Sequence, residues 1–247
     1  MPAVTFVLIH GGGSTGRFWD RLAPLLPGPV LSVDLPGRAD RPADLASLTV
    51  DDEAASIVTD IVQAGITDPI VLVAHSSGGL VVPAVVAGLA GAGRSVERIA
   101  LNAALVPEEG GCGLDCMKPR HREGLVWAVE QATTDGTVIT LPGAPTDPEP
   151  FRTAYGGDPL DDDQLAFVTD PARCVADTVH HYFQPVRWSS AAGVPVTYLL
   201  NERDRPVAPA DQELMAARLP DLVGIVRLDC GHLPAVTHPQ DLAAALA

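Results

Sequence analysis

A short apolar run that ends in a serine between small residues limits the folds open to this chain more than any other feature. Residues 70–74 read as a buried strand, Ser76 follows directly, and a helical pattern covers residues 80–90. A serine on such a sharp strand-to-helix turn is lifted clear of the sheet, where its oxygen can meet a base and a substrate. The backbone is crowded there, so its neighbours must be small, as Ala74 and Gly78 are. The run follows the pattern G-x-S-x-G, with Ala74 in place of the first glycine, and predicts a nucleophilic serine.

Short apolar runs alternate with helical patterns along much of the chain, which indicates parallel strands joined by helical crossovers. Strands are expected at residues 4–9, 30–33, 70–74, 99–102, 196–200 and 224–228. Helices are expected at residues 18–26, 50–63, 80–90, 210–219 and 240–246. Thr49, followed by acidic residues at 51–53, is a typical N-terminal cap for the second helix. Pro83 lies inside the third and is expected to remove one hydrogen bond or kink it.

The alternation stops between about residues 107 and 185. This segment holds fourteen acidic residues against five Lys and Arg, a net of −9, and is too long for an ordinary loop. Shorter helical patterns at residues 122–131 and 172–183 indicate an inserted cap rather than a structureless linker. We therefore expect residues 1–106 and 186–247 to form the core and residues 107–185 an inserted cap or lid.

Several aromatic residues and histidines in or beside this segment have two interpretations each. Trp127 and Tyr155 fit an apolar pocket wall and a buried cap core equally well. The pair His180-His181 and Trp188 lie where substrate contacts are plausible, although a solvated surface is the preferred interpretation.

Composition limits the classes of protein to which this chain can belong. With 247 residues, 47% of them hydrophobic, the chain can bury a large core, and its formal charge of −15 argues against nucleic acid and anionic membranes as partners. The first apolar run is too short for a signal-peptide core and lacks a basic flank, and no run approaches the ~18 apolar residues that span a bilayer. The four cysteines are too sparse for a disulfide framework. We expect a cytoplasmic protein.

Neither a metal nor an organic cofactor is predicted. Cys112 and Cys116, with His121 nearby, suggest a metal site or a disulfide, but a second ligand pair at suitable spacing is missing. The glycine-rich loop at residues 11–13 lacks both the spacing of a dinucleotide fingerprint and the lysine of a P-loop.

A nucleophilic serine needs a base, and the base needs an acceptor that orients it. Asp204 lies in the loop after the strand at residues 196–200, and His232 follows the last expected strand. The carboxyl ends of parallel strands meet at one edge of a sheet, so Ser76, Asp204 and His232 are expected to converge there, in the chain order Ser, Asp, His. The competing acids are Asp229, Asp211 and Glu202. Asp204 is favoured because it lies directly beyond its strand, whereas Asp229 reads as the end of one.

A loop after the first strand, His10-Gly11-Gly12-Gly13, reaches the same edge. Glycines let backbone N–H groups approach a ligand closely, so the N–H groups of Gly12 and Ser77 are the predicted oxyanion donors. His75 either lines the pocket or packs at the turn, and Asp34 reads as a turn-former.

These motifs together resemble those of α/β-hydrolase-fold enzymes over about residues 4–106 and 194–246. The residues that carry the resemblance are Phe6-Val7-Leu8-Ile9-His10-Gly11-Gly12-Gly13 with Trp19, Asp34-Leu35-Pro36-Gly37, Ala74-His75-Ser76-Ser77-Gly78-Gly79, Asp204 with Pro206, and Gly231-His232. The opening resembles the branch that contains plant methylesterases and hydroxynitrile lyases. The resemblance implies Ser76 as nucleophile, His232 as base, Asp204 as its acid, and a cap that covers the pocket.

The lyases of this branch carry a threonine after the first-strand histidine and a lysine after the catalytic histidine, where this chain has Gly11 and Leu233. Hydrolysis of a small-molecule carboxylic ester or related acyl compound, through a covalent acyl-enzyme, is therefore the predicted function. The alternatives are a lyase or carbon–carbon bond-cleaving enzyme with the same three residues, and a ligand-binding receptor with slow turnover. The oligomeric state is left open.

Overall fold

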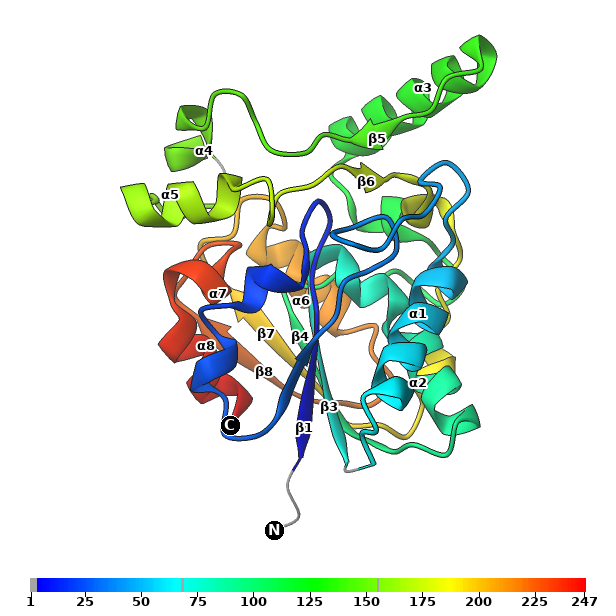
Figure 1. The fold of residues 1–247 in the computed structure, drawn as a ribbon, viewed down its shortest axis with the longest axis vertical. Helices are drawn as coiled ribbons and strands as arrows, with labels where there is room; N and C mark the ends of the chain where they lie inside the picture. The colour runs from blue at the N-terminus through cyan, green and yellow to red at the C-terminus, as the bar shows by residue number, and fades with distance from the viewer. Residues whose placement is uncertain (1–3, 68, 155) are drawn as a thin grey trace.

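A sheet of six parallel strands runs through the centre of the protein, with helices on both of its faces (Figure 1). The computed structural model describes residues 4–67, 69–154 and 156–247. The strands are β1 (Thr5–Ile9), β2 (Val30–Ser32), β3 (Ile70–His75), β4 (Val96–Asn102), β7 (Val196–Asn201) and β8 (Leu222–Leu228), in the order β2-β1-β3-β4-β7-β8. The predicted mostly parallel sheet of about six strands, flanked by helices, is confirmed.

Burial explains why the sequence predicts the central strands. All six residues of β3 are buried, and the strand pairs with β1 on one side and β4 on the other. A strand covered on both faces reads as a continuous apolar run rather than an alternating one. The register brings Ala74 opposite Ile9 and Leu101, so the carboxyl ends of the three strands lie level.

Two layers of helices and turns cover the sheet. On one face lie α1 (Val50–Gln63), α2 (Val82–Gly91) and α6 (Pro209–Ala216). On the other lie the short 3-10 turns η1 (Gly16–Trp19) and η2 (Ala23–Leu25), with α7 (Pro234–Thr237) and α8 (Pro239–Leu246). Thr49 caps α1 as predicted, because its side chain accepts a hydrogen bond from the backbone of Asp52, whose carboxylate accepts one from the backbone of Thr49.

The segment at residues 107–185 lies over the carboxyl ends of the strands (Figure 1). It contains α3 (Pro119–Asp135), α4 (Glu149–Ala154), α5 (Asp162–Thr169), the turns η4 (Gly113–Cys116) and η5 (His180–Phe183), and an antiparallel pair of β5 (Thr140–Leu141) and β6 (Asp177–Thr178). Helix α3 projects away from the sheet, and Ala132 is its one buried residue. The pattern that predicts a helix at residues 122–131 is confirmed within α3.

Two helix predictions are wrong. Residues 18–26 form η1 and η2 rather than a helix, because Pro24 has no N–H to donate within a longer helix. Residues 172–183 form β6 and η5, because Asp177 and Thr178 are buried in extended backbone against other parts of the chain.

The expected kink at Pro83 is also wrong. Helix α2 begins at Val82, after the 3-10 turn η3 (Ser76–Val81), so Pro83 occupies its first turn. A proline is tolerated there because the N–H groups of the first turn have no partner within a helix.

The preferred interpretation of His180-His181 and Trp188 as a solvated surface is wrong for two of the three. His181 and Trp188 are buried, and Trp188, in η6 (Trp188–Ala191), packs in the main core. Trp127 is 64% exposed and therefore belongs neither to a pocket wall nor to a buried core. Tyr155, the other candidate for such a wall, lies outside the described residues.

Two further properties bear on the sequence predictions. Cys112, Cys116, Cys174 and Cys230 are all free. Among the described residues, every helix is too short or too polar to cross a lipid bilayer.

Candidate active site

The turn after β3 holds Ser76 in an unusual backbone conformation. Its φ of +53° lies in the left-handed region, which costs a residue other than glycine roughly 1 kcal/mol or more. The turn is close-packed: a Cβ on Gly78 would lie 2.5 Å from the carbonyl oxygen of His10, and one on Gly11 would lie 2.8 Å from Cβ of Ser76. Strain at this position is what presents the serine hydroxyl at the end of the sheet.

Ser76, His232 and Asp204 are joined by hydrogen bonds. Nε2 of His232 lies 3.1 Å from Oγ of Ser76, and Nδ1 of His232 lies 2.7 Å from Oδ2 of Asp204. A carboxylate can only accept, so Nδ1–H donates to Asp204 and Nε2 is left to accept from the serine hydroxyl. The structure thus brings together the three residues that the sequence predicts to converge.

The rival acids lie elsewhere. Oδ1 of Asp204 accepts a hydrogen bond from the backbone N–H of Val207 at 2.8 Å, which fixes the carboxylate behind His232. Asp229 and Glu202 are exposed and form ion pairs with Arg203 and Arg227, respectively. Asp211 is partly buried in the first turn of α6. Among these four acids, Asp204 is the one that contacts His232.

His75 packs at the turn, which decides between its two interpretations. Its Nε2–H donates to the backbone carbonyl of His232 at 2.7 Å, and its ring stacks on Phe18 with centroids 5.0 Å apart. Burial, reinforced by the neighbouring His232, lowers the pKa of His75 well below its usual value. His75 is therefore a neutral support beneath His232.

The glycine loop approaches the serine turn closely. A Cβ on Gly12 would lie 2.9 Å from the hydroxyl of Tyr182 and 3.2 Å from Oγ of Ser77, so the loop needs glycine at this position. The predicted oxyanion donors, the N–H groups of Gly12 and Ser77, thus belong to backbone segments that face one another beside Ser76.

A buried cluster of charges anchors this loop. Oδ2 of Asp177 accepts a hydrogen bond from the N–H of Gly13 at 2.8 Å, and Oδ1 pairs with the guanidinium of Arg38. Arg38 also donates to Glu53 at 2.8 Å, and His181 lies 3.4 Å from the same carboxylate. Burial favours neutral carboxyls, yet the facing charges of Arg38 and His181 hold the pKa values of Asp177 and Glu53 below their usual range.

Nothing in the local sequence predicts this cluster. No short spacing links its members, since Asp177 lies 139 residues from Arg38 along the chain. The ligand atoms of Glu53, Asp177 and His181 are close enough together to hold a cation. However, the guanidinium of Arg38 already bonds to both carboxylates, so the donor set fits an internal ion pair rather than a metal.

A second missed residue holds the histidine loop. Asp158, which is buried, accepts a hydrogen bond from the N–H of Gly231 at 2.7 Å. The neighbouring carbonyl of Gly156 accepts one from the N–H of His232 at 2.6 Å. Residues 107–185 therefore anchor the loops on both sides of Ser76.

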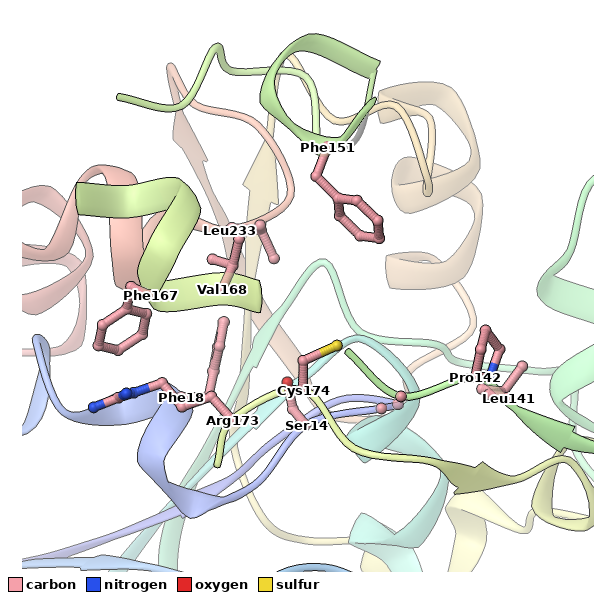
Figure 2. Close-up of a pocket in the computed structure, with 13 residues that line it drawn as sticks. Ser14, Phe18, Leu141, Pro142, Phe151, Phe167, Val168, Arg173, Cys174 and Leu233 are labelled. Carbon is pink, nitrogen blue, oxygen red and sulfur yellow. The ribbon is translucent and has the colours of Figure 1, made fainter. Parts of the chain in front are cut away.

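Two pockets meet beside the serine. The serine pocket, of about 450 Å³, is lined by Ser76, His232, Leu105, Lys118, Tyr182 and Arg205, among others. The side pocket, of about 300 Å³, is lined by Phe18, Phe151, Phe167, Val168, Arg173 and Leu233, among others (Figure 2). Gly12 and Leu141 line both pockets, so the two are neighbours at the glycine loop.

The sequence matches the alpha/beta hydrolase family over residues 6–245. The chain belongs to this family. The family predicted from the sequence is thereby confirmed. No curated protein sequence matches the chain.

Solved structures of several hydrolases share the fold. An extracellular α/β-hydrolase from a Paenibacillus species, described as sharing structural and functional homology with tobacco salicylic acid binding protein 2, is 20% identical with a TM-score of 0.80, over 98% of this chain and 97% of that one. A pyrethroid hydrolase from Sphingobium faniae is 20% identical with a TM-score of 0.73, over 99% and 96% of the two chains. A methylesterase from Arabidopsis is 19% identical with a TM-score of 0.70, over 99% of this chain and 97% of that one.

Proposed function

We propose that this alpha/beta hydrolase cleaves a carboxylic ester or a related acyl compound through a covalent acyl-enzyme on Ser76. The observation that carries the proposal is the unbroken hydrogen-bonded path from Oγ of Ser76 through His232 to Asp204. A base within hydrogen-bond reach of a serine, itself oriented by a buried acid, is the arrangement that activates a serine hydroxyl.

In the first half-reaction, Oγ of Ser76 attacks the substrate carbonyl while Nε2 of His232 takes the serine proton. Asp204 stabilises the imidazolium that forms, and the N–H groups of Gly12 and Ser77 bind the oxyanion of the tetrahedral intermediate. His232 then gives its proton to the leaving alcohol, the bond between the carbonyl carbon and that oxygen breaks, and the acyl group stays on Ser76.

In the second half-reaction, His232 removes a proton from water, which attacks the acyl carbon. The tetrahedral intermediate returns to the carbonyl with Oγ of Ser76 as leaving group, and His232 returns the proton to Ser76. The acid product departs. This chain's own residues supply every proton transfer in the sequence.

Residues 107–185 act in this proposal as the cap over the core formed by residues 1–106 and 186–247. In support, the segment contributes Phe151 and Phe167 to the side pocket and Lys118 to the serine pocket. A cytoplasmic location stays a prediction of the sequence, and one of the similar structures is of an extracellular protein.

An ester substrate is further supported by two of the similar structures, which are described as a methylesterase and a pyrethroid hydrolase. A lyase or carbon–carbon bond-cleaving enzyme would use the same three residues and release an aldehyde, a ketone or a second carbon fragment instead of an alcohol. Analysis of both products by mass spectrometry separates these reactions. A receptor would bind a ligand saturably and turn it over slowly.

The test is a panel of p-nitrophenyl esters of graded acyl length, extended to lactones and thioesters, with wild-type enzyme and Ser76→Ala. We expect turnover of at least one class, and loss of roughly 10³-fold or more of that turnover in Ser76→Ala. Equal turnover by the variant would refute the mechanism.

A further inference from the structure

The inference that follows rests on the proposed function and names its substrate class. We propose that the substrate carries an apolar group on one side of its acyl linkage and an anionic group, a carboxylate in the simplest case, on the other. The apolar group occupies the side pocket, and Lys118 and Arg205 bind the anion in the serine pocket.

The serine pocket carries positive charge. Lys118 and Arg205 line it, and no aspartate or glutamate stands among the described residues that do. This local excess contrasts with a chain whose formal charge is −15 and in which Lys118 is the one lysine. Cationic groups at the mouth of a cleft raise the local concentration of anionic substrates.

The charges of these cations are not balanced by acids. Nζ of Lys118 donates to the backbone carbonyl of Arg205 at 2.7 Å, and Nη1 of Arg205 donates to the carbonyl of Thr153 at 2.7 Å. These bonds hold both side chains at the pocket without neutralising them. Over the described part of the chain, Lys118 and Arg205 both lack a carboxylate within ion-pair distance.

The acids nearest to Lys118 lie outside the serine pocket. Asp115 and Asp211 line an adjacent pocket, which Lys118 and Arg218 also line. Burial raises the pKa of the Cys116 thiol, which also lines the serine pocket, to about 12, so it remains neutral. The carboxylate of Asp115 accepts a hydrogen bond from the N–H of Cys112 and lies 3.7 Å from the guanidinium of Arg122. Asp204 is buried behind His232, whose imidazolium it offsets during the reaction.

The side pocket has the opposite character. Figure 2 shows Phe151 from α4 and Phe167 and Val168 from α5 around it, together with Leu233. Among the described residues that line it, Arg173 alone is charged. Arg173 is ion-paired with Asp170 and with Asp20, the latter at 2.8 Å, and lies over the ring of Phe167 at 4.1 Å.

A neutral, apolar group therefore fits the side pocket better than an ion does. Because both pockets meet at Gly12, a substrate that fills them would place its carbonyl beside Ser76 and the predicted oxyanion donors. The two halves of the substrate then differ in charge: one half is apolar and the other is anionic.

Matched substrates test this inference. In one series the alcohol half varies: the 3-phenylpropanoyl esters of 4-hydroxybenzoate, 4-hydroxybenzamide and 4-hydroxyphenyl phosphate are anionic, neutral and phosphorylated partners of nearly equal shape. In a mirrored series the acyl half varies: the 2-phenylethyl monoester of adipate is compared with its monoamide. We expect kcat/KM for the carboxylate to exceed that of its amide by about tenfold or more in one series, an advantage that shrinks as ionic strength rises.

The phosphate-bearing substrate distinguishes a carboxylate-binding site from a phosphate-binding site. A rate for the phosphate well below that for the benzoate supports the carboxylate, whereas the reverse order overturns that choice of anion. Amides that match or exceed their carboxylates in both series overturn the inference.

Substitutions of Lys118 and Arg205 test whether these residues bind the anionic group of the substrate. Lys118→Gln and Arg205→Gln should each lower the ratio of carboxylate to amide kcat/KM several-fold, about half an order of magnitude for each exposed charge. The matched control is Arg120→Gln, which removes an exposed cation from the first turn of α3. Arg120 lies two residues after Lys118, the N-cap residue of that helix, and outside the serine pocket. That control should leave the ratio unchanged. A ratio that Lys118→Gln and Arg205→Gln leave intact overturns the assignment of the binding residues.

The inference and the proposed function fail in different ways. Ser76-dependent hydrolysis without preference for the carboxylate overturns the substrate class and leaves the serine mechanism standing. No Ser76-dependent turnover of any ester in either series overturns both.

Discussion

The residue directly before the serine supports the histidine that faces it. Nε2 of His75 donates to the backbone carbonyl of His232 at 2.7 Å, and the two imidazole rings lie 4.6 Å apart. One side chain therefore ties the serine turn to the histidine loop, although the two residues are 157 positions apart in the chain. This contact fixes the position of the proposed base relative to the proposed nucleophile.

His75→Phe keeps an aromatic ring against Phe18 and removes the hydrogen bond to His232. We expect kcat to fall about fivefold with little change in KM, because a lost hydrogen bond of about 1 kcal/mol misplaces the base without altering the pocket. Steady-state kinetics of an ester substrate measure this split. An unchanged kcat would contradict the supporting role of His75.

Asp204→Asn retains the shape of the side chain and removes its charge. The amide can donate to Nδ1 of His232 and so favours the wrong tautomer, and kcat should fall by a factor on the order of 10³–10⁴. The matched control is Asp229→Asn, two residues from Gly231 but exposed and bonded to Arg203, which should change kcat less than twofold, roughly. Comparable losses in the two variants would mean that Asp204 is not the orienting acid.

Asp177→Asn tests the buried cluster. It leaves the guanidinium of Arg38, which is 1% exposed, with one carboxylate fewer, and the free energy of unfolding should drop by about 3 kcal/mol. Urea denaturation measures the loss. Asp163→Asn, which breaks an exposed pair with Arg21, should cost less than about 1 kcal/mol. Equal costs would show that burial adds nothing to the Asp177 pair.

Stability should also depend on His10 at acid pH. Burial lowers the pKa of His10 to about 4, while an unfolded chain binds the same proton near the ordinary value of 6.5. Above pH 6.5 His10 is neutral in both states and costs no stability. As the pH falls from 6.5 toward 4, the unfolded chain takes up the proton first, and the free energy of unfolding drops by about 3 kcal/mol in total.

The variant His10→Gln isolates that contribution. Urea denaturation at several pH values gives the difference in unfolding free energy between wild type and variant, in which the titration of other groups cancels. We expect this difference to shrink as the pH falls through the window from 6.5 to 4. A difference that stays constant over the window would mean that His10 is not buried in its neutral form.

The sequence predicts the elements whose local signals are strong. The β-branched run of β3 and the capped periodic pattern of α1 are both confirmed, since each is decided by residues close together in the chain. The helix expected at residues 18–26 fails because Pro24 limits the local backbone to short turns. Local pattern therefore predicts strands and long helices better than the turns between them.

The sequence likewise predicts some residues of the candidate site and not others. Chain order and strand ends suffice to predict that Ser76, Asp204 and His232 gather at one edge of the sheet. No local signal predicts that Asp177 and Asp158 are buried, since each is stabilised by partners far away in the sequence, such as Arg38 and Gly231. The burial of His181 is hidden for the same reason, because Glu53 lies 128 residues away.

The central claim is that the acyl group passes through Ser76, and trapping the intermediate tests it most directly. Wild-type enzyme is quenched with acid during turnover of a p-nitrophenyl ester, digested, and analysed by peptide mass spectrometry. The account predicts the mass of the acyl group on the peptide that contains Ser76, and neither adduct nor turnover in Ser76→Ala. Continued turnover by Ser76→Ala, with no acylated serine in the wild type, would contradict it.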